Sequence, residues 1–165
     1  KYTMVDVIND LGLELTQDTI IKVMGVGGGG CNAVNYLYSQ GISDVSFLVC
    51  NTDKQCLGRS SVPAKLQLGP GWGAGGKPEV AQEYAEQSRE RIREALNDGT
   101  QMLFITAGMG GGTGTGAAPV IAAMAKKKGI LTVGVVTIPF KSQGPETMTK
   151  ALSRLFMQFL LTVTI

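Results

Sequence analysis

The nine residues Gly108-Met109-Gly110-Gly111-Gly112-Thr113-Gly114-Thr115-Gly116 decide the fold that we expect for this chain. An apolar run at 102–106 precedes them and predicts a buried strand, and residues 117–125 follow with the apolar spacing of a helix. Because six of the nine residues are glycine, a ligand can lie directly on the backbone N–H groups. The N-terminus of the helix points its positive end at the same place. The stretch therefore predicts a phosphate-binding loop, since a flexible linker rarely joins a buried strand to a helix.

The composition indicates a single domain of ordinary size and argues against several classes of function. The chain has 165 residues, 44% of them hydrophobic and 17% charged, with a net charge of +2. This balance gives no reason to expect nucleic acid as a partner, and the absence of a long apolar run predicts no membrane insertion. Histidine is absent, and the three cysteines have no metal-like spacing. Free thiols without a signal sequence favour a cytoplasmic location.

Strands and helices are expected to alternate along the chain. This order predicts an α/β fold with a doubly wound, mainly parallel sheet flanked by helices. Residues 1–19 are expected to form an N-terminal extension, and residues 20–165 the nucleotide-binding domain. Strands are predicted at 20–26, 45–50, 64–68, 102–106, 130–137 and 159–165, and helices from Asn32 to Gly41, from Pro78 to about Leu96, after Gly116, and from Glu146 to Gln158.

A second glycine run leaves a competing interpretation open. Gly25-Val26-Gly27-Gly28-Gly29-Gly30 formally satisfies the GxGxxG pattern of dinucleotide-binding folds, and Asp53 follows at the distance of their ribose-binding acid. Taken alone, these residues predict a Rossmann module for NAD or FAD. The pattern is weak, because a glycine-rich run satisfies many templates, and such a fold does not need the later loop at 108–116. The chain contains no Walker motif.

Several segments together resemble one family. Gly110-Gly111-Gly112-Thr113-Gly114-Thr115-Gly116 resembles the tubulin signature motif in its bacterial form. The similarity extends through residues 21–30, Asn51-Thr52-Asp53, Gly73-Ala74-Gly75 with Pro78-Glu79, and residues 132–137. These segments occur in the family's order over roughly residues 20–145. The chain is thus identified as similar to the FtsZ family of bacterial tubulin homologues, the cell-division GTPases, in its N-terminal GTP-binding domain.

The resemblance implies a ligand, partners and site residues. The ligand would be GTP or GDP with Mg²⁺, bound between the subunits of a head-to-tail filament. The filament would lie at the division septum and would have other division proteins as partners. No catalytic base or metal-ligand set is assigned within the chain. By position, the resemblance places the following residues around the nucleotide: Gly28, Gly29, Gly30, Cys31, Asn32, Asn51, Thr52, Asp53, Ala74, Gly75, Gly110, Gly111, Gly112, Thr113, Gly114, Thr115, Gly116, Pro139 and Gln143.

Three of these residues or their neighbours have alternative interpretations. Asn32 is equally suited to begin a helix. Asp53 is also able to cap a turn, but the resemblance favours a place beside Mg²⁺ and phosphate. Trp72, the only tryptophan, is expected either to respond to nucleotide in its glycine-rich loop or to pack permanently on the domain.

Three departures from the family pattern affect the expected activity. The stretch from Leu68 to Pro78 is several residues shorter than in the family, so we expect the loop near the γ-phosphate to be altered or incomplete. Gln143 and Thr147 stand where the family usually has a glutamate and a basic residue. The chain also ends at Ile165, before the central helix, acidic loop and second domain of the family. We therefore expect a GTPase domain that is incomplete for hydrolysis alone, because the acidic loop comes from the adjacent subunit. A scaffold that keeps the fold but has lost the ligand is the remaining alternative.

Overall fold

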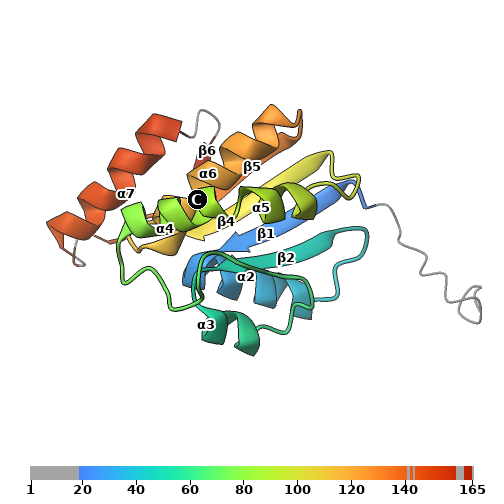
Figure 1. Cartoon of the computed structure of the whole chain (residues 1–165), viewed down its shortest axis with the longest axis horizontal. Helices are drawn as coiled ribbons and strands as arrows, with labels where there is room; N and C mark the ends of the chain where they lie inside the picture. Colours follow the sequence, from blue (N-terminus) through green and yellow to red (C-terminus); the bar gives the residue numbers. More distant parts are fainter. Residues whose placement is uncertain (1–18, 141, 143, 159–161, 165) are drawn as a thin grey trace, which may run out of the picture.

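The computed structural model describes residues 19–140, 142, 144–158 and 162–164. These residues form a six-stranded sheet in the order β3-β2-β1-β4-β5-β6, in which every neighbouring pair is parallel (Figure 1). The arrangement confirms the predicted doubly wound sheet. The expected extension at 1–18 lies outside the described residues. The strands are β1 (Ile21–Val26), β2 (Ser46–Asn51), β3 (Lys65–Gln67), β4 (Met102–Gly108), β5 (Leu131–Thr137) and β6 (Thr162–Thr164).

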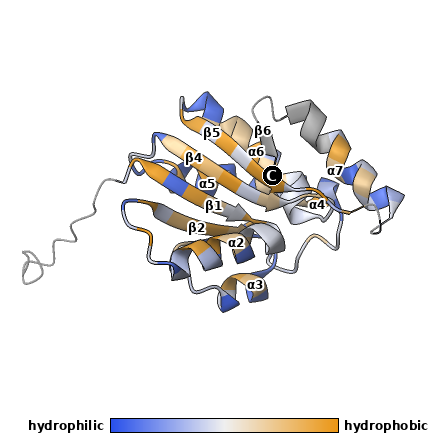
Figure 2. Ribbon diagram, turned by 180° about the vertical axis from the view of Figure 1, so that it is seen from behind, coloured by the Kyte–Doolittle hydropathy of each residue, from blue (hydrophilic) through white to orange (hydrophobic). Residues whose placement is uncertain are grey.

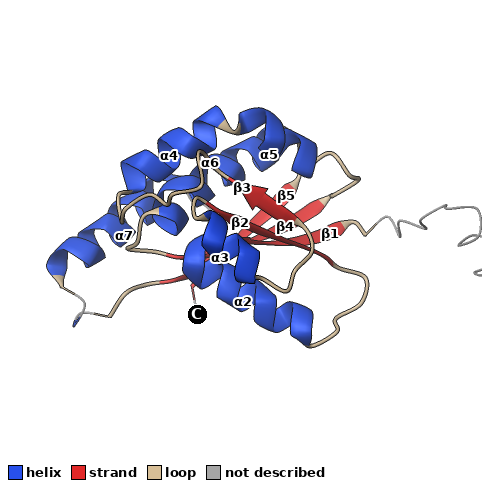
Figure 3. Ribbon diagram, turned by 60° about the horizontal axis from the view of Figure 1, so that its bottom comes forward, coloured by secondary structure: helices blue, strands red, loops and turns tan. Residues whose placement is uncertain are grey.

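Helices cover both faces of the sheet. A smaller group of helices lies on one face and a larger group on the other, as Figures 1 and 3 show from two directions. Within the larger group, α4 packs on α6, and α6 also contacts α7. The helices are α2 (Gly27–Ser39) and α3 (Lys54–Arg59) on the first face, and α4 (Pro78–Gln87), α5 (Arg89–Ala95), α6 (Thr113–Lys127) and α7 (Pro145–Gln158) on the second.

The central strands are apolar because helices bury both of their faces. Met24 and Val26 of β1 and Leu103 and Ile105 of β4 are completely buried, and Figure 2 shows much of both strands in the orange of hydrophobic residues. The larger core cluster joins these strands to residues such as Ile121 of α6. A smaller cluster lies beneath α2 and α3 and contains Cys31, Val34, Val49, Leu57 and Val62.

The first helix differs from the prediction at its start. The helix begins at Gly27 and not at Asn32, so the glycine run is its first turn instead of a loop. Gly27 has a φ of +75°, a conformation that favours glycine, and it turns the chain sharply from β1 into α2. The prediction was wrong because glycine has low helix propensity, whereas here close packing against the sheet outweighs propensity.

Two further features of the chain were not expected. The short helix α3 follows Asp53, which caps it, and the helix predicted from Pro78 to Leu96 is interrupted at Ser88. The Ser88 hydroxyl accepts a hydrogen bond from the Gly69 N–H at 3.3 Å, which ties the break to the end of β3. Such side-chain bonds to backbone compete with helix continuation. The exposed charges of α4 and α5 are solvated as predicted, with ion pairs such as Arg93–Glu90.

The strand order determines where a ligand can bind. From β1 the chain first adds β2 and then β3 on one side of β1. It then crosses over and adds β4, β5 and β6 on the other side of β1. The order therefore reverses between β1 and β4, and open α/β sheets bind ligands at the carboxyl ends of the strands at such a point. Within the described residues, no helix combines the length and the apolar composition needed to cross a membrane.

Candidate functional site

Two helices begin side by side at this reversal point. β1 leads directly into α2, and β4 leads through Met109–Gly112 into α6. A Cβ built on Gly27 would lie 2.8 Å from the Gly114 nitrogen, and one on Gly29 would lie 3.4 Å from the Gly108 Cα. The first turns of α2 and α6 are thus in contact, and their N-terminal N–H groups share one edge of the sheet.

Both helix starts are electropositive and open to an anion. Within the described part of the chain, neither α2 nor α6 has a side-chain cap or an acidic residue in its first turn. The first N–H groups of a helix have no partner within the helix, and side chains usually supply one. Here two such sets of donors and two helix dipoles point toward the same surface, which suits a phosphate group.

The glycines at this edge serve two different purposes. Some are needed because protein packs on protein: a Cβ on Gly30 would lie 2.2 Å from the Thr106 oxygen, and one on Gly116 would lie 2.0 Å from the Pro78 oxygen. Gly114 is similarly tight against the Gly108 oxygen. By contrast, Gly28 and Gly111 are exposed, and no described atom lies within 4 Å of a Cβ built on either. This second group leaves room for a ligand.

The two threonines of the signature segment have different surroundings. The Thr115 hydroxyl is fully buried and accepts a hydrogen bond from the Gly110 N–H at 2.8 Å, so it shapes the loop. Thr113 is half-buried at the first position of α6, and its Oγ1 lies 2.7 Å from the Oγ1 of Thr52. Thr52 itself is completely buried. Of these hydroxyls, Thr113 is the one with access to the helix starts.

Asp53 caps α3 in the structure. Its Oδ1 accepts hydrogen bonds from the N–H groups of Gln55 at 2.8 Å and Cys56 at 3.3 Å. The Asp53 N–H in turn donates to the side-chain oxygen of Asn51, which is buried. The interpretation of Asp53 as a cap is thus confirmed. These contacts do not engage its Oδ2. Asn51 supports the turn from within.

Cys31 and Asn32 point in different directions from α2. Cys31 is buried, its thiol approaches the carbonyl oxygens of Gly25 and Cys50, and burial raises the pKa of this thiol to about 12. Its side chain belongs to the core. Asn32 is exposed and lines a polar hollow of about 320 Å³ between α2 and α3 with Asn35, Asp53, Gln55, Cys56 and Arg59. Asn32 and Asp53 were predicted as site residues, whereas Asn35, Gln55, Cys56 and Arg59 were not. The last three lie on α3, which was missed although an aspartate before a polar stretch is a capping signal.

The second glycine-rich loop lies against the start of α6. A Cβ on Gly112 would be 3.0 Å from the Lys77 nitrogen and 3.2 Å from the Ala74 Cβ. Ala74 is buried by this packing, whereas Gly75 is exposed. Trp72 is 91% exposed, so the interpretation that it packs on the domain is wrong. The loop thus brings Gly75 to the same edge as α6.

The segment after β5 supports the glycine loop from behind. Pro139 is buried, and a Cβ on Gly110 would lie 3.2 Å from its Cγ and 2.7 Å from the Thr147 Cγ2. This contact explains why Gly110, with a φ of +98°, cannot carry a side chain. Gln143 lies outside the described residues.

The site as described is rich in donors and poor in metal ligands. Among the described residues, no group of three His, Cys, Asp or Glu side chains is placed to hold a metal ion. Asp53 is the acid nearest in sequence to the Thr52–Thr113 contact. Magnesium in nucleotide sites is commonly bound by one or two carboxylates together with phosphates and water. The residues present therefore fit a metal that a bound phosphate helps to hold.

Comparisons with known proteins agree on one family. The model of the Tubulin/FtsZ family GTPase domain matches residues 20–159. The cell division protein FtsZ of Porphyromonas gingivalis is 59% identical over 138 residues, which are 81% of this chain and 30% of that protein. The solved FtsZ dimer of M. jannaschii, described as empty, superposes with a TM-score of 0.83 at 40% identity, covering 99% of this chain and 49% of that one.

A third relative is described with a nucleotide. CetZ2 from Haloferax volcanii, a protofilament with bound GTPγS, has a TM-score of 0.77 at 26% identity over 87% of this chain and 48% of its own. The chain thus spans between about a third and a half of the length of these relatives. The comparisons favour the tubulin-type interpretation over the dinucleotide-binding module that Gly25–Gly30 also allowed. With its strand order, paired helix starts and family match over residues 20–159, the chain belongs to the Tubulin/FtsZ family, and the match lies in the family's GTPase domain.

Proposed function

We propose that this chain binds GTP and GDP, with the phosphates on the paired N-termini of α2 and α6. The observation that carries the proposal is the contact between two helix starts that, in the described residues, have neither side-chain caps nor first-turn acids. Gly28, Gly29 and Gly111 present exposed backbone there, and Thr113 adds a hydroxyl. The family match and the GTPγS-bound CetZ2 relative support a guanine nucleotide as the source of these phosphates.

Magnesium fits the same site in a limited role. Asp53 would contribute Oδ2, which its described capping contacts do not engage, either directly or through water, and the nucleotide phosphates would supply most of the remaining ligands. When bound, the ion would neutralise charge on the phosphates. The chain's own N–H and hydroxyl donors hold and orient the phosphate oxygens.

The chain is proposed to be one half of a shared hydrolytic site. The donors at the helix starts stabilise negative charge but do not deprotonate or orient a water molecule. Relatives in this family include a dimer and a protofilament. A neighbouring subunit in a head-to-tail filament would supply the acidic groups, and such a filament with nucleotide between its subunits would act in cell division, as the name of the P. gingivalis relative indicates.

A competition experiment tests the binding proposal. A fluorescent guanine nucleotide is titrated with the chain in the presence of Mg²⁺, and anisotropy is measured while GTP, GDP or NAD is added. GTP and GDP should displace the probe and NAD should not. A chain that folds but binds none of these nucleotides would support the scaffold alternative and contradict the proposal.

Phosphate release tests the shared site. The isolated chain should release phosphate from GTP at a negligible rate, even at saturating nucleotide and magnesium. Addition of a full-length FtsZ that carries its own acidic loop but is inactivated for nucleotide binding should raise the rate. Turnover by the isolated chain that is first order and insensitive to dilution would show a complete site within one subunit.

A further inference from the structure

The contact between Thr52 and Thr113 joins two distant segments at the candidate site. Thr52 follows β2, and Thr113 is the first residue of α6, with their Oγ1 atoms 2.7 Å apart. Thr52 has no exposed surface, whereas Thr113 is half-buried and lies beside Gly27 at the start of α2. Thr52 therefore has no path to a ligand at this edge, although Thr113 has one.

The direction of this hydrogen bond follows from burial. Each hydroxyl has one proton to donate, and a buried proton without an acceptor costs free energy. Over the described residues, Thr113 is the side-chain partner of the Thr52 hydroxyl, so a reversed bond would leave the Thr52 proton without a described acceptor. If Thr52 donates, the Thr113 proton is free to point outward. The favoured direction runs from Thr52 to Thr113 and then to an acceptor at the helix starts.

The backbone holds Thr52 in place independently of this bond. The Thr52 carbonyl oxygen accepts from the Gly73 N–H at 2.9 Å, and the next residue, Asp53, bridges to Trp72 across the same turn. Thr113, in contrast, is at the first helical position, where no preceding turn restricts its side chain. The hydroxyl of the fixed Thr52 thus favours the Thr113 rotamer that hydrogen-bonds to it.

We propose that Thr52 is a positioning residue for phosphate binding: its hydroxyl donates to Thr113 and aims the Thr113 proton at a phosphate oxygen. Thr52 itself does not touch the nucleotide, in contrast to the direct contact that the family resemblance implied for it. The proposal rests on the proposed function, because it takes a nucleotide phosphate as the acceptor. A chain of two hydroxyls ending on an anion is also strengthened cooperatively.

A double-mutant cycle tests whether Thr52 acts through Thr113. Guanine-nucleotide affinity is measured for wild type, Thr52→Val, Thr113→Val and the double variant. Thr52→Val keeps the shape and removes the hydroxyl, and it should weaken binding about fivefold, whereas Thr113→Val should weaken it about tenfold. In the Thr113→Val background, Thr52→Val should cause no further loss. Thr52→Ser, which keeps the donor, should restore most of the affinity.

The control is a buried hydroxyl at the opposite end of the sheet. Thr100 is 8% exposed and donates to Asp98 at 2.6 Å, so Thr100→Val removes a comparable bond without approaching the site. It should lower stability and leave nucleotide affinity unchanged. If Thr52→Val does not fold, Thr52→Ala takes its place in the cycle.

Three outcomes would overturn the positioning role. These are unchanged affinity in Thr52→Val, equal losses in both Thr113 backgrounds, and no recovery in Thr52→Ser. Failure of the wild-type chain to bind nucleotide would instead refute the proposed function, so the two failures are distinguishable.

Discussion

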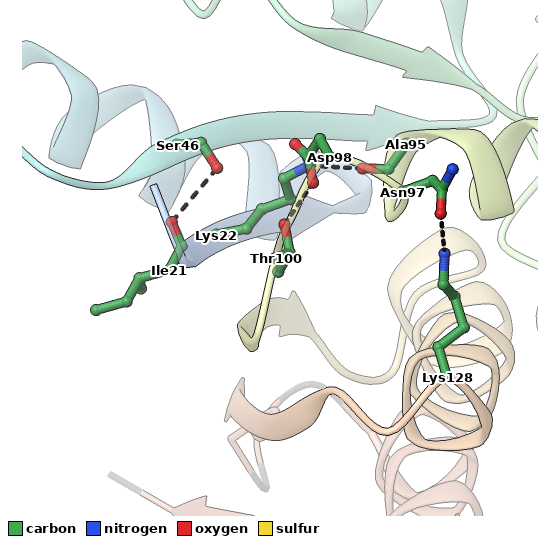
Figure 4. Close-up of polar contacts among 8 residues, drawn as sticks. All are labelled: Ile21, Lys22, Ser46, Ala95, Asn97, Asp98, Thr100 and Lys128. Atoms are coloured by element: carbon green, nitrogen blue, oxygen red, sulfur yellow. Dashed lines mark hydrogen bonds and ion pairs between the residues drawn. The ribbon is translucent and has the colours of Figure 1, made fainter. Parts of the chain in front are cut away.

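The two ends of the sheet differ in how their polar groups are paired. At the amino ends of the strands, Lys22 is 5% exposed and donates to the Asp98 carboxylate and the Ala95 carbonyl, each at 2.5 Å. Thr100 donates to the same carboxylate, and Lys128 donates to Asn97 (Figure 4). At the carboxyl ends, the starts of α2 and α6 present neutral N–H groups that no described side chain caps.

This difference separates stability from binding. A charge that leaves water needs partners, and the amino end supplies them to Lys22 from the residues just before β4. The first N–H groups of a helix also need hydrogen-bond partners, but at the carboxyl end no described side chain caps α2 or α6. The polar groups of the amino end are therefore paired without a ligand, whereas we propose that an anion pairs those of the carboxyl end. Substitutions at the two ends should separate these properties.

The largest effect should come from removing the Asp98 carboxylate at the amino end of the sheet. Asp98→Ala leaves the Lys22 ammonium buried without its counter-charge, and we expect it to lower the free energy of unfolding by about 3 kcal/mol. This figure is at the low end for a broken buried pair, because the Asp98 side chain is half-exposed. Urea denaturation measures the change. Nucleotide affinity of the folded chain should stay constant, and a parallel loss of affinity would show that the two ends are coupled.

A smaller effect, on nucleotide affinity and not on stability, is expected at the carboxyl end. Gly28→Val adds a side chain where no described atom lies within 4 Å, so the fold should tolerate it, but the side chain covers exposed N–H groups. Loss of one hydrogen bond to a charged group is worth roughly 1.5–3 kcal/mol, which corresponds to about thirtyfold weaker nucleotide binding.

Gly58→Val is the matched control for this substitution. Gly58 also lies in a helix, is exposed, and would meet no described atom within 4 Å. Its substitution should leave nucleotide affinity within about twofold of wild type, measured by the same anisotropy titration. Similar losses in both variants would count against α2 as the phosphate site.

The smallest expected effect is a pH dependence at the amino end. Partial burial alone would raise the pKa of Asp98, but hydrogen bonds from Lys22 and Thr100 outweigh it and hold the pKa below its ordinary value. A lowered carboxyl pKa in the folded state stabilises the protein above the ordinary aspartate value of about 4. This stabilisation is lost as the pH falls from that value through the folded-state pKa.

Urea midpoints at pH 6, 4 and 3 measure this dependence. The midpoint of the wild-type chain should fall in the acidic steps, and that of Asp98→Asn should fall less because the titrating group is gone. Identical pH profiles for the two proteins would show that other carboxyl groups account for the acid sensitivity.

Much of the fold could be predicted, because apolar runs and glycines mark where strands end and helices begin. The purpose of each glycine could not be predicted in the same way. Gly28 and Gly30 are neighbours in one run, yet Gly28 faces open space and Gly30 packs against the Thr106 oxygen. That difference depends on β4, which is far away in sequence. The break at Ser88 likewise depends on a bond from Gly69.

The candidate site shows the same limit at the level of side chains. The resemblance grouped Thr52, Thr113 and Thr115 as nucleotide contacts, but burial and hydrogen bonds distinguish their roles. Local sequence also allowed Asp53 to cap a turn, and this is what its Oδ1 does. Which hydroxyl faces a ligand is decided by tertiary packing, and a motif alone does not contain that information.

The position of β1 in the middle of the sheet has a consequence for how the protein is made. Val23 pairs with Phe47, which leaves the ribosome soon after it, and with Phe104, which is synthesised much later. Contacts between residues so distant in sequence slow folding, because a long loop must close before they form. The starts of α2 and α6 meet only at this late junction between the two halves of the chain. A nucleotide bound there would select molecules that have finished folding and, by mass action, would draw the remaining chains toward that state.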